Sequence, residues 1–334
     1  MRRAGKLGFE ALNAALKAAG EETRLRILTL LAEAELTVSD ITEILRQSQP
    51  RISRHLKLLV EAGLVDRFRE GTWAFFRLAE HGVHGDVARA LLERLDPDDR
   101  IIARDHERLS SVRQARAAAA QAYFRSHAAD WDRIRKLHVT DEAVEESIRS
   151  ALADGTFRSL LDLGTGTGRI LEMFGPVIER GLGLDLSLDM LLLARDRIER
   201  AGLRNCSVRQ GDIYDLPLAN DSFDVVVLHQ VLHFLDDGAR AIREAARVLR
   251  PGGRLLVVDF APHEQEFLRE QFAHRRLGFA SETVMQWMVT AGLEPVMHKS
   301  LPPESGSEGK IAVSLWLARD RRALMATPLR REVA

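Results

Sequence analysis

Two kinds of hydrophobic pattern divide the chain. Apolar residues recur at helical spacing through much of residues 9–135, whereas short apolar runs alternate with helical stretches between residues 158 and 260. The first pattern is typical of amphipathic helices, and the second of buried parallel strands connected by helices. The chain is therefore expected to combine a mainly helical N-terminal part with an α/β C-terminal domain.

The strongest local signal is a glycine-rich turn after the apolar run 160–163. Gly164, Gly166 and Gly168 alternate with threonines, and we expect a helix from about Thr167. Glycines let a backbone turn sharply and approach a ligand closely, while the N–H groups of a following helix point at that ligand. The spacing departs from the dinucleotide fingerprint because Arg169 takes the place of its last glycine. A simple turn in an unrelated α/β domain is the alternative.

Acidic residues after the next two strands extend this signal. Asp185 ends the run 181–184, roughly twenty residues after the glycines, where a carboxylate can accept both ribose hydroxyls. Asp212 follows the third strand and could accept an adenine amino hydrogen, with Ile213 and Met190 flanking the ring. These features predict a nucleoside-like ligand.

Four features occur together between residues 158 and 260: the glycine loop, Asp185, Gly211-Asp212 and the turn 249–253. Through this combination, the segment resembles class I S-adenosylmethionine (SAM)-dependent methyltransferases that act on small molecules. The resemblance implies a Rossmann-like fold with a seven-stranded, mostly parallel sheet. It also implies that SAM or its product S-adenosylhomocysteine (SAH) lies along the carboxyl ends of the strands. The expected cofactor-binding residues are Asp162, Gly164, Thr165, Gly166, Gly168, Asp185, Leu186, Met190, Gly211, Asp212, Ile213 and His229.

The N-terminal pattern predicts helices, a turn, another helix and then a hairpin over residues 64–78. Thr37 to Ile41 opens a short helix, for which Ser39 or Asp40 is the expected cap. Pro50 suits the first turn of the next helix, which should carry apolar residues inward and polar ones outward. Helix, turn, helix and hairpin together predict a winged helix-turn-helix.

The distribution of charge supports a DNA-binding role for this region. The formal net charge is −1, from 48 Lys and Arg against 49 Asp and Glu, so any attraction to DNA must be local. A local basic strip does occur, although a solvated helix face with a chance excess of charge is the alternative. The expected DNA-binding residues are Ser48, Gln49, Arg51, Ser53, Arg54, His55, Lys57 and Arg69.

Residues 22–28, 48–59 and 61–65 resemble the ArsR/SmtB family of bacterial repressors. The resemblance implies a homodimer that places helix 48–60 in successive major grooves of a pseudo-palindromic, double-stranded operator. Metal-sensing members have paired cysteines where this chain has Thr37 and Ser39, so soft-metal sensing is disabled there.

We therefore expect a winged helix-turn-helix DNA-binding domain at residues 1–85, a helical connector and dimerisation segment at 86–135, and a methyltransferase-like domain at 136–320. Two helices with a bend near Pro97 are expected in the connector, and residues 264–292 are also expected to be helical. Cys206 is the only cysteine, which fits a reducing cytoplasm, and no long apolar segment suggests a membrane span.

These features predict a transcriptional regulator, a repressor, whose methyltransferase domain senses SAM or SAH. The alternative is an active small-molecule methyltransferase fused to a DNA-binding domain. His229 and His233 lie near the expected reaction centre and are candidate general bases, with local packing as the alternative. A third hypothesis is a metal sensor that uses His81, His84 and Asp86.

Overall fold

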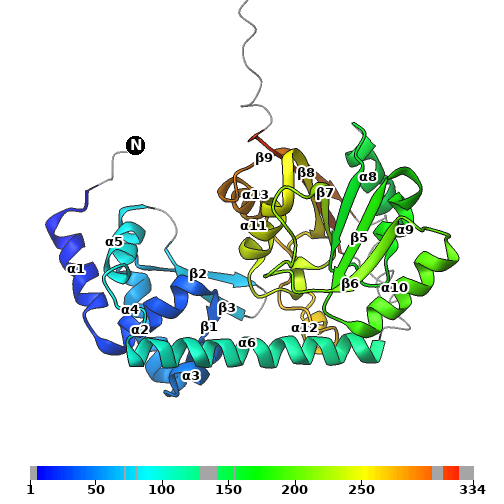
Figure 1. The fold of residues 1–334 in the computed structure, drawn as a ribbon. Coiled ribbons are helices and arrows are strands. Elements are labelled where there is room, and N and C mark those ends of the chain that lie inside the picture. The colour runs from blue at the N-terminus through cyan, green and yellow to red at the C-terminus, as the bar shows by residue number, and fades with distance from the viewer. Residues whose placement is uncertain are drawn as a thin grey trace, which may run out of the picture. The chain divides into compact units, whose positions relative to one another are not determined.

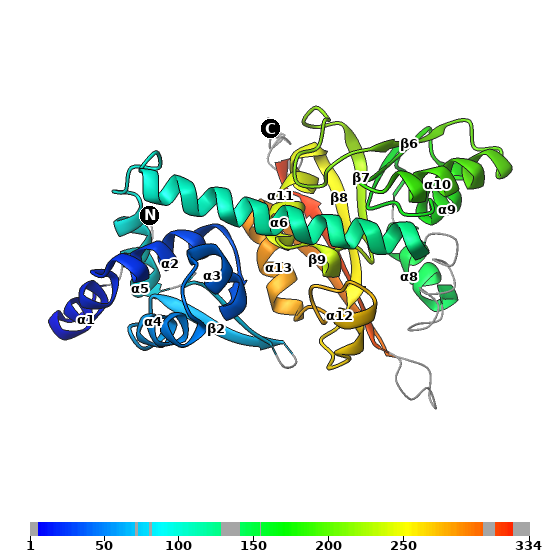
Figure 2. The same ribbon diagram turned by 90° about the horizontal axis from the view of Figure 1, so that it is seen from below.

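The computed structural model describes residues 6–70, 73–79, 82–127, 141–153, 155–302 and 311–322 (Figure 1). The chain divides into two compact units, Met1–Ala118 and Ala119–Ala334. The division falls inside helix α6 (Arg100–His127), which both ribbon views draw as one unbroken helix (Figures 1 and 2). Among the described residues, no helix combines the length and the apolar character that a membrane span requires.

The N-terminal unit is a winged helix-turn-helix, as predicted. It pairs β1 (Leu36–Thr37) and β2 (Val65–Glu70) with opposite edges of the central strand β3 (Trp73–Leu78), all antiparallel. Its helices are α1 (Phe9–Ala19), α2 (Glu22–Glu33), α3 (Val38–Leu45), α4 (Gln49–Glu61), α5 (Gly82–Leu92) and the first part of α6. The predicted bend of the connector is confirmed, because Pro97 lies between α5 and α6.

Local chemistry explains where the helices of this unit begin. Thr37 caps α3: its Oγ1 accepts a hydrogen bond from the Asp40 N–H (3.3 Å), and Asp40 Oδ2 accepts one from the Thr37 N–H (2.9 Å). The prediction of Ser39 or Asp40 as cap was therefore wrong, because Asp40 is the reciprocal partner in the first turn. Pro50 lies in the first turn of α4, as predicted.

The C-terminal unit is built on a seven-stranded sheet in the order β6-β5-β4-β7-β8-β10-β9. The parallel strands are β4 (Ser159–Leu163), β5 (Arg180–Asp185), β6 (Cys206–Gln210), β7 (Phe223–His229) and β8 (Leu249–Phe260). β10 (Val313–Asp320) runs antiparallel to both β8 and β9 (Leu293–Leu301). This arrangement confirms the predicted mostly parallel sheet.

Helices cover both faces of that sheet, because successive strand residues point to opposite sides. Leu160 belongs to one apolar cluster, with α8 (Asp141–Ala153), α9 (Arg169–Phe174) and α10 (Leu188–Arg200). Leu161 belongs to the other, with α11 (Gly238–Val248) and α13 (Ser281–Thr290). The short elements are η2 (Gly175–Val177), η3 (Leu232–Phe234) and α12 (Phe267–Gln271).

One expected helix is interrupted. Residues 264–292 had a helical pattern, but only α12 and α13 form there. Between them the chain returns to the end of β8, where the His263 N–H donates to the Leu277 carbonyl (3.0 Å) and the Phe279 N–H to the Phe260 carbonyl (2.9 Å). Gly278 has φ +82°, and a Cβ there would lie 2.1 Å from the Ala261 carbonyl oxygen. This close backbone approach is incompatible with a continuous helix.

Candidate nucleoside site and nucleic-acid interface

The glycine loop connects β4 to α9, and α9 begins at Arg169 rather than near Thr167. Gly164, Gly166 and Gly168 all have positive φ, at 70°, 51° and 81°, a conformation that glycine adopts without a steric penalty. The Gly164 N–H donates to the Leu184 carbonyl (2.8 Å), which ties the loop to β5. A Cβ on Gly164 would lie 2.4 Å from Val231 Cγ2. The loop is therefore shaped by its neighbours as well as by its own sequence.

Two predicted cofactor residues brace this loop from inside the protein. Asp162 and Thr165 are both buried, and the Thr165 hydroxyl donates to Asp162 Oδ2 (2.6 Å). A Cβ on Gly183 would lie 2.6 Å from Thr165 Oγ1, so the Thr165 side chain occupies the space beside this glycine. These contacts give both residues a structural role in positioning the loop.

Asp185, at the end of β5, contacts the glycine loop. Its Oδ2 accepts a hydrogen bond from the Gly166 N–H (2.9 Å), and its Oδ1 accepts one from the Ser187 N–H (2.8 Å). Burial raises the pKa of Asp185, although the backbone hydrogen bonds oppose that shift. Each carboxylate oxygen has a second lone pair, so the group can still accept ribose hydroxyls.

The predicted adenine-binding residues follow β5 and β6. The Gly211 N–H donates to the Asp185 carbonyl (3.1 Å), which joins the two strand ends. Asp212 is exposed, and its Oδ1 accepts a hydrogen bond from the Tyr214 N–H (2.8 Å). Met190 and Ile213 are buried, whereas Leu186 is exposed. Two acidic residues and a loop with three glycines, at the carboxyl edge of the sheet, fit a nucleoside ligand.

The two candidate bases differ in their surroundings. His229 is the last residue of β7 and is half-buried. His233 is 2% exposed, and its Nδ1 lies 2.8 Å from Oδ1 of the fully buried Asp259. Sequence reasoning missed Asp259, although an acid within the apolar run 255–260 was a signal that could have identified it.

The described residues contain no group of three or more His, Cys, Asp and Glu side chains arranged to hold a metal ion. Of the histidines in the metal-sensor hypothesis, His81 lies outside the described residues. Asp86 Oδ1 instead accepts a hydrogen bond from Arg89 Nη2 (2.7 Å).

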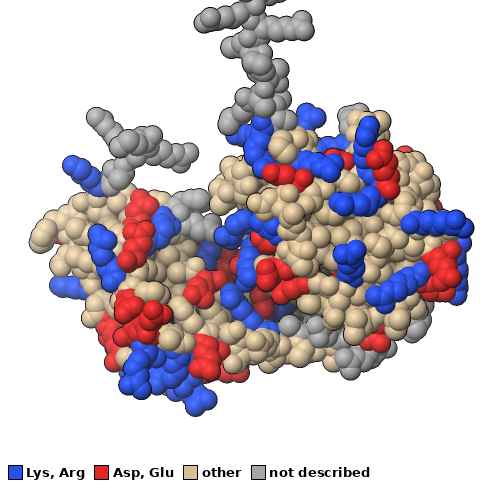
Figure 3. Space-filling model, in the orientation of Figure 1, with Lys and Arg blue, Asp and Glu red and all other residues tan. Residues whose placement is uncertain are grey.

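The candidate DNA interface is the outer face of α4 together with β2. Ile52, Leu56 and Leu59 are buried, as predicted. The residues that are exposed instead are Ser48, Gln49, Arg51, Ser53, Arg54, Lys57 and, on β2, Arg69. On the face drawn in Figure 3, basic and acidic side chains are interspersed over both units, which agrees with a net charge near zero.

His55 is the partial exception among the expected DNA-binding residues. It is half-buried, and its Nδ1 lies 3.5 Å from Oε2 of Glu21, which caps α2. Burial lowers the pKa of His55, and nearby arginines lower it further, whereas Glu21 opposes the shift. The ring lies at the edge of the exposed face and contacts the rest of the domain.

Comparisons with known proteins agree with both domains. Residues 21–67 match the family model described as "Bacterial regulatory protein, arsR family", and residues 161–257 match the model described as "Methyltransferase domain". The chain therefore joins an ArsR-type helix-turn-helix to a methyltransferase domain with the class I fold.

Individual relatives match the second domain. The "Uncharacterized methyltransferase YcgJ" of Bacillus subtilis is 34% identical over 115 residues, which are 34% of this chain and 46% of that protein. The "Ubiquinone/menaquinone biosynthesis C-methyltransferase UbiE" of Vibrio vulnificus is 36% identical over 106 residues, 30% of this chain and 41% of that protein. The crystal structure of YcgJ is 22% identical, with a TM-score of 0.45, and the match covers 54% of this chain and 99% of that one. This chain thus spans less than half the length of these two curated relatives.

Proposed function

We propose that this protein is a DNA-binding transcriptional regulator, a repressor, whose methyltransferase domain acts as a sensor of SAM or SAH. The observation that carries this proposal is helix α6, which is fixed to the DNA-binding unit by a buried ion pair and continues into the unit with the candidate nucleoside site. As a regulator of bacterial genes, the protein would act in the cytoplasm.

On the DNA side, the exposed basic residues of α4 support a role as recognition helix, and Arg69 on β2 supports a contact of the wing with the DNA backbone. Helix α1 supports a homodimer, because Phe9, Leu12 and Leu16 form an apolar stripe with 86%, 38% and 46% exposure. A second copy of the chain packed there would present two recognition helices to half-sites about 34 Å apart.

On the ligand side, Asp185 would accept the ribose hydroxyls and Asp212 the adenine amino group, with Met190 and Ile213 beside the ring. The glycine loop would let the ligand approach the backbone closely, because its three glycines have no Cβ. SAM and SAH differ by a methyl group and a positive charge on sulfur. When bound, SAM supplies an electrophilic methyl group. A sensor that distinguishes the two needs groups near the sulfur, and His229, at the end of β7, is the proposed candidate.

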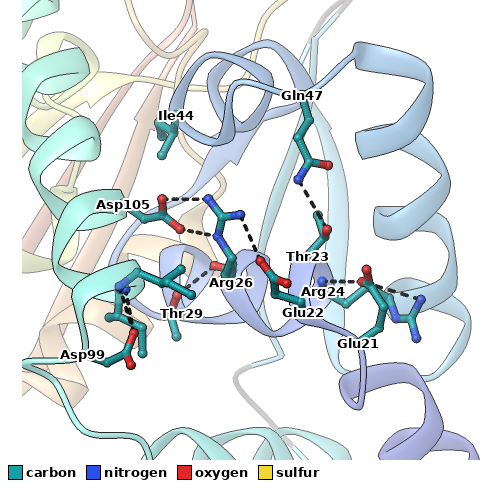
Figure 4. A network of polar contacts seen from close by, with 12 residues as sticks. Glu21, Glu22, Thr23, Arg24, Arg26, Thr29, Ile44, Gln47, Asp99 and Asp105 are labelled. Carbon is teal, nitrogen blue, oxygen red and sulfur yellow. Dashed lines mark hydrogen bonds and ion pairs between the residues drawn. The ribbon is translucent and has the colours of Figure 1, made fainter.

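The link between the sites begins with Arg26 on α2 (Figure 4). Its Nε donates to Asp105 Oδ2 (2.6 Å) and its Nη2 to Asp105 Oδ1 (2.8 Å). Two further arginines of α6 hold the same unit: Arg108 donates to the Ile44 carbonyl (3.2 Å) and Arg113 to the Glu33 carbonyl (2.9 Å). A displacement of α6 would therefore pull on α2 and α3, the helices next to the recognition helix.

A ligand can act through this link only by its different affinity for the DNA-competent and DNA-incompetent states. The test is binding of the full-length protein to its operator, measured by fluorescence anisotropy with and without SAH or SAM. We expect one of the two nucleosides to change operator affinity by at least about fivefold. An affinity that neither nucleoside changes, although calorimetry shows that they bind, would refute the sensor.

The alternative, an active methyltransferase, is favoured by one observation, the buried pair of His233 and Asp259. Turnover is tested with SAM and a panel of small acceptors, and release of SAH in step with a methylated product would establish the enzyme.

A further inference from the structure

We propose that Arg169 is a positioning residue that transmits nucleoside binding from the glycine loop to helix α8, through its ion pair with Glu145. The inference rests on the proposed nucleoside site and names the first step by which a bound ligand acts on the rest of the chain. It gives a role to the residue that replaces the last glycine of the dinucleotide fingerprint.

Arg169 is the first residue of α9 and directly follows Gly168 of the glycine loop. The Gly168 N–H donates to the Thr165 carbonyl (2.8 Å), so a shift of the loop moves the start of α9 and Arg169 with it. The start of a helix favours acidic residues, because its unpaired N–H groups carry partial positive charge. An arginine that breaks this local preference is expected to have a compensating contact elsewhere.

Two carboxylates compensate the charge of Arg169. Its Nε donates to Glu145 Oε1 and its Nη2 to Glu145 Oε2, both at 2.7 Å, and its Nη1 donates to Glu172 Oε2 (2.6 Å). Glu145 is a buried residue of α8, whereas Glu172 belongs to α9 itself. A guanidinium that donates two parallel hydrogen bonds to one carboxylate fixes both distance and direction. The pair with Glu145 therefore fixes α8 to the start of α9.

The neighbouring contacts differ from this pair in direction or in kind. Thr167, also in the loop, is buried, and its Oγ1 accepts a hydrogen bond from Arg197 Nη1 (3.0 Å), which connects the loop to α10. Ile170 of α9 and Val144 of α8 belong to the same apolar cluster, but apolar attraction is non-directional. The pair of Arg169 with Glu145 adds a directional contact between the loop and α8.

Helix α8 is the first element that the structure describes after α6 in the chain. A ligand that draws the glycine loop toward itself shifts Gly168 and Arg169, and the ion pair passes this shift to Glu145. Because α8 follows the connector in sequence, a change in α8 can reach α6 through the chain itself. Arg169 thus connects the proposed nucleoside site with the start of the proposed link to DNA.

Hydrogen exchange resolved by peptide tests this step in the full-length protein, at SAH concentrations that calorimetry shows to saturate each variant. In the wild type, SAH should slow the exchange of α8 at least about fivefold more than that of α13, which packs on the opposite face of the sheet. Arg169→Met removes the charge and keeps an unbranched stem, and it should reduce this difference below about twofold. Glu145→Gln should do the same, because it breaks the ion pair from α8 and leaves the loop unchanged.

Arg250→Met is the matched control. Arg250 Nη1 pairs with Asp224 Oδ1 at a similar distance, 2.9 Å, but Asp224 lies near the amino end of β7, at the opposite end of that strand from the glycine loop. This variant should keep the wild-type difference between α8 and α13. Loss of the difference in Arg250→Met would overturn the inference, because any ion pair of the unit would then have the same effect.

The full difference in a variant of Arg169 or Glu145 that still binds SAH would also overturn the inference. Equal slowing of α8 and α13 in the wild type would do so as well, and so would loss of SAH binding by both variants, since the pair would then only shape the site. If the wild type does not bind SAH, the nucleoside site is refuted and this inference with it. If α8 responds to SAH while operator affinity does not, the sensor is refuted and this inference stands.

Discussion

The buried ion pair between α2 and α6 gives the sharpest prediction of stability. Asp105 is 0% exposed and Arg26 is 9% exposed, so the change Asp105→Ala leaves a guanidinium in the interior without its carboxylate. Breaking such a pair from one side costs about 3–5 kcal/mol. Glu22, at 3.7 Å from Arg26, can compensate only in part because its side chain is 73% exposed. We therefore expect a loss near 3 kcal/mol.

Hydrogen exchange resolved by peptide measures this loss where it occurs. A loss of about 3 kcal/mol should speed the exchange of residues 22–33 and 100–113 more than about a hundredfold, because 1.4 kcal/mol is tenfold. Asp86→Ala is the matched control: its pair with Arg89 has a similar distance, 2.7 Å, but the side chains are 41% and 58% exposed. An exposed pair contributes less than about 1 kcal/mol.

Equal effects of the two substitutions would refute the claim that burial makes the Arg26–Asp105 pair important. The double variant Arg26→Met/Asp105→Leu should recover much of the stability, because an apolar pair of similar volume often replaces a buried ion pair without loss. For function, Asp105→Ala should bind SAH normally while SAH loses its effect on operator affinity. If SAH changed the operator affinity of Asp105→Ala as much as that of the wild type, the Arg26–Asp105 pair would not be part of the proposed link.

Three further predictions concern the two sites. In Gly164→Ala, the positive φ costs about 1–2 kcal/mol and the new Cβ meets Val231, so calorimetry should show an SAH affinity at least about fivefold lower. The double variant Gly164→Ala/Val231→Ala should recover part of this affinity, and no recovery would show that the contact with Val231 is unimportant. Only an ionised Asp185 accepts both ribose hydroxyls, and burial raises its pKa. SAH affinity should therefore fall as the pH drops through that raised pKa, at a higher pH than for an ordinary aspartate. The affinity of Asp185→Asn should not depend on pH in this way, and a wild type that is equally independent of pH would contradict the prediction. Arg54→Ala should weaken operator binding and reduce its salt dependence by about one phosphate contact. The control is Arg195→Ala, because Arg195 is an exposed residue of α10, and this change should have neither effect. Operator binding by Arg54→Ala at the wild-type level would exclude Arg54 from the interface.

Local signals made much of the fold predictable from the sequence. The glycine loop, the acid at the end of β5 and the inward face of α4 are each encoded by neighbouring residues or by a helical period. The structure confirms the sheet and the winged helix-turn-helix from these patterns.

The features that the sequence did not predict depend on contacts between distant segments. Arg26 and Asp105 are 79 positions apart, and His233 and Asp259 are 26 apart. No periodicity indicates which partner a buried charge will find. The interrupted helix over 264–292 was mispredicted for the same reason, because Gly278 responds to the approach of the Ala261 backbone.

We propose that one sulfur nucleoside, bound at the carboxyl edge of the sheet, controls the affinity of the winged helix-turn-helix for DNA. The most direct measurement is a titration of the protein–operator complex with SAH, and separately with SAM, followed by anisotropy of labelled DNA. We expect one of them to shift the operator affinity, and we expect Asp185→Ala to abolish that shift while DNA binding without ligand stays intact. Operator affinity that stays constant to millimolar concentrations of both nucleosides would refute control of DNA binding by the nucleoside.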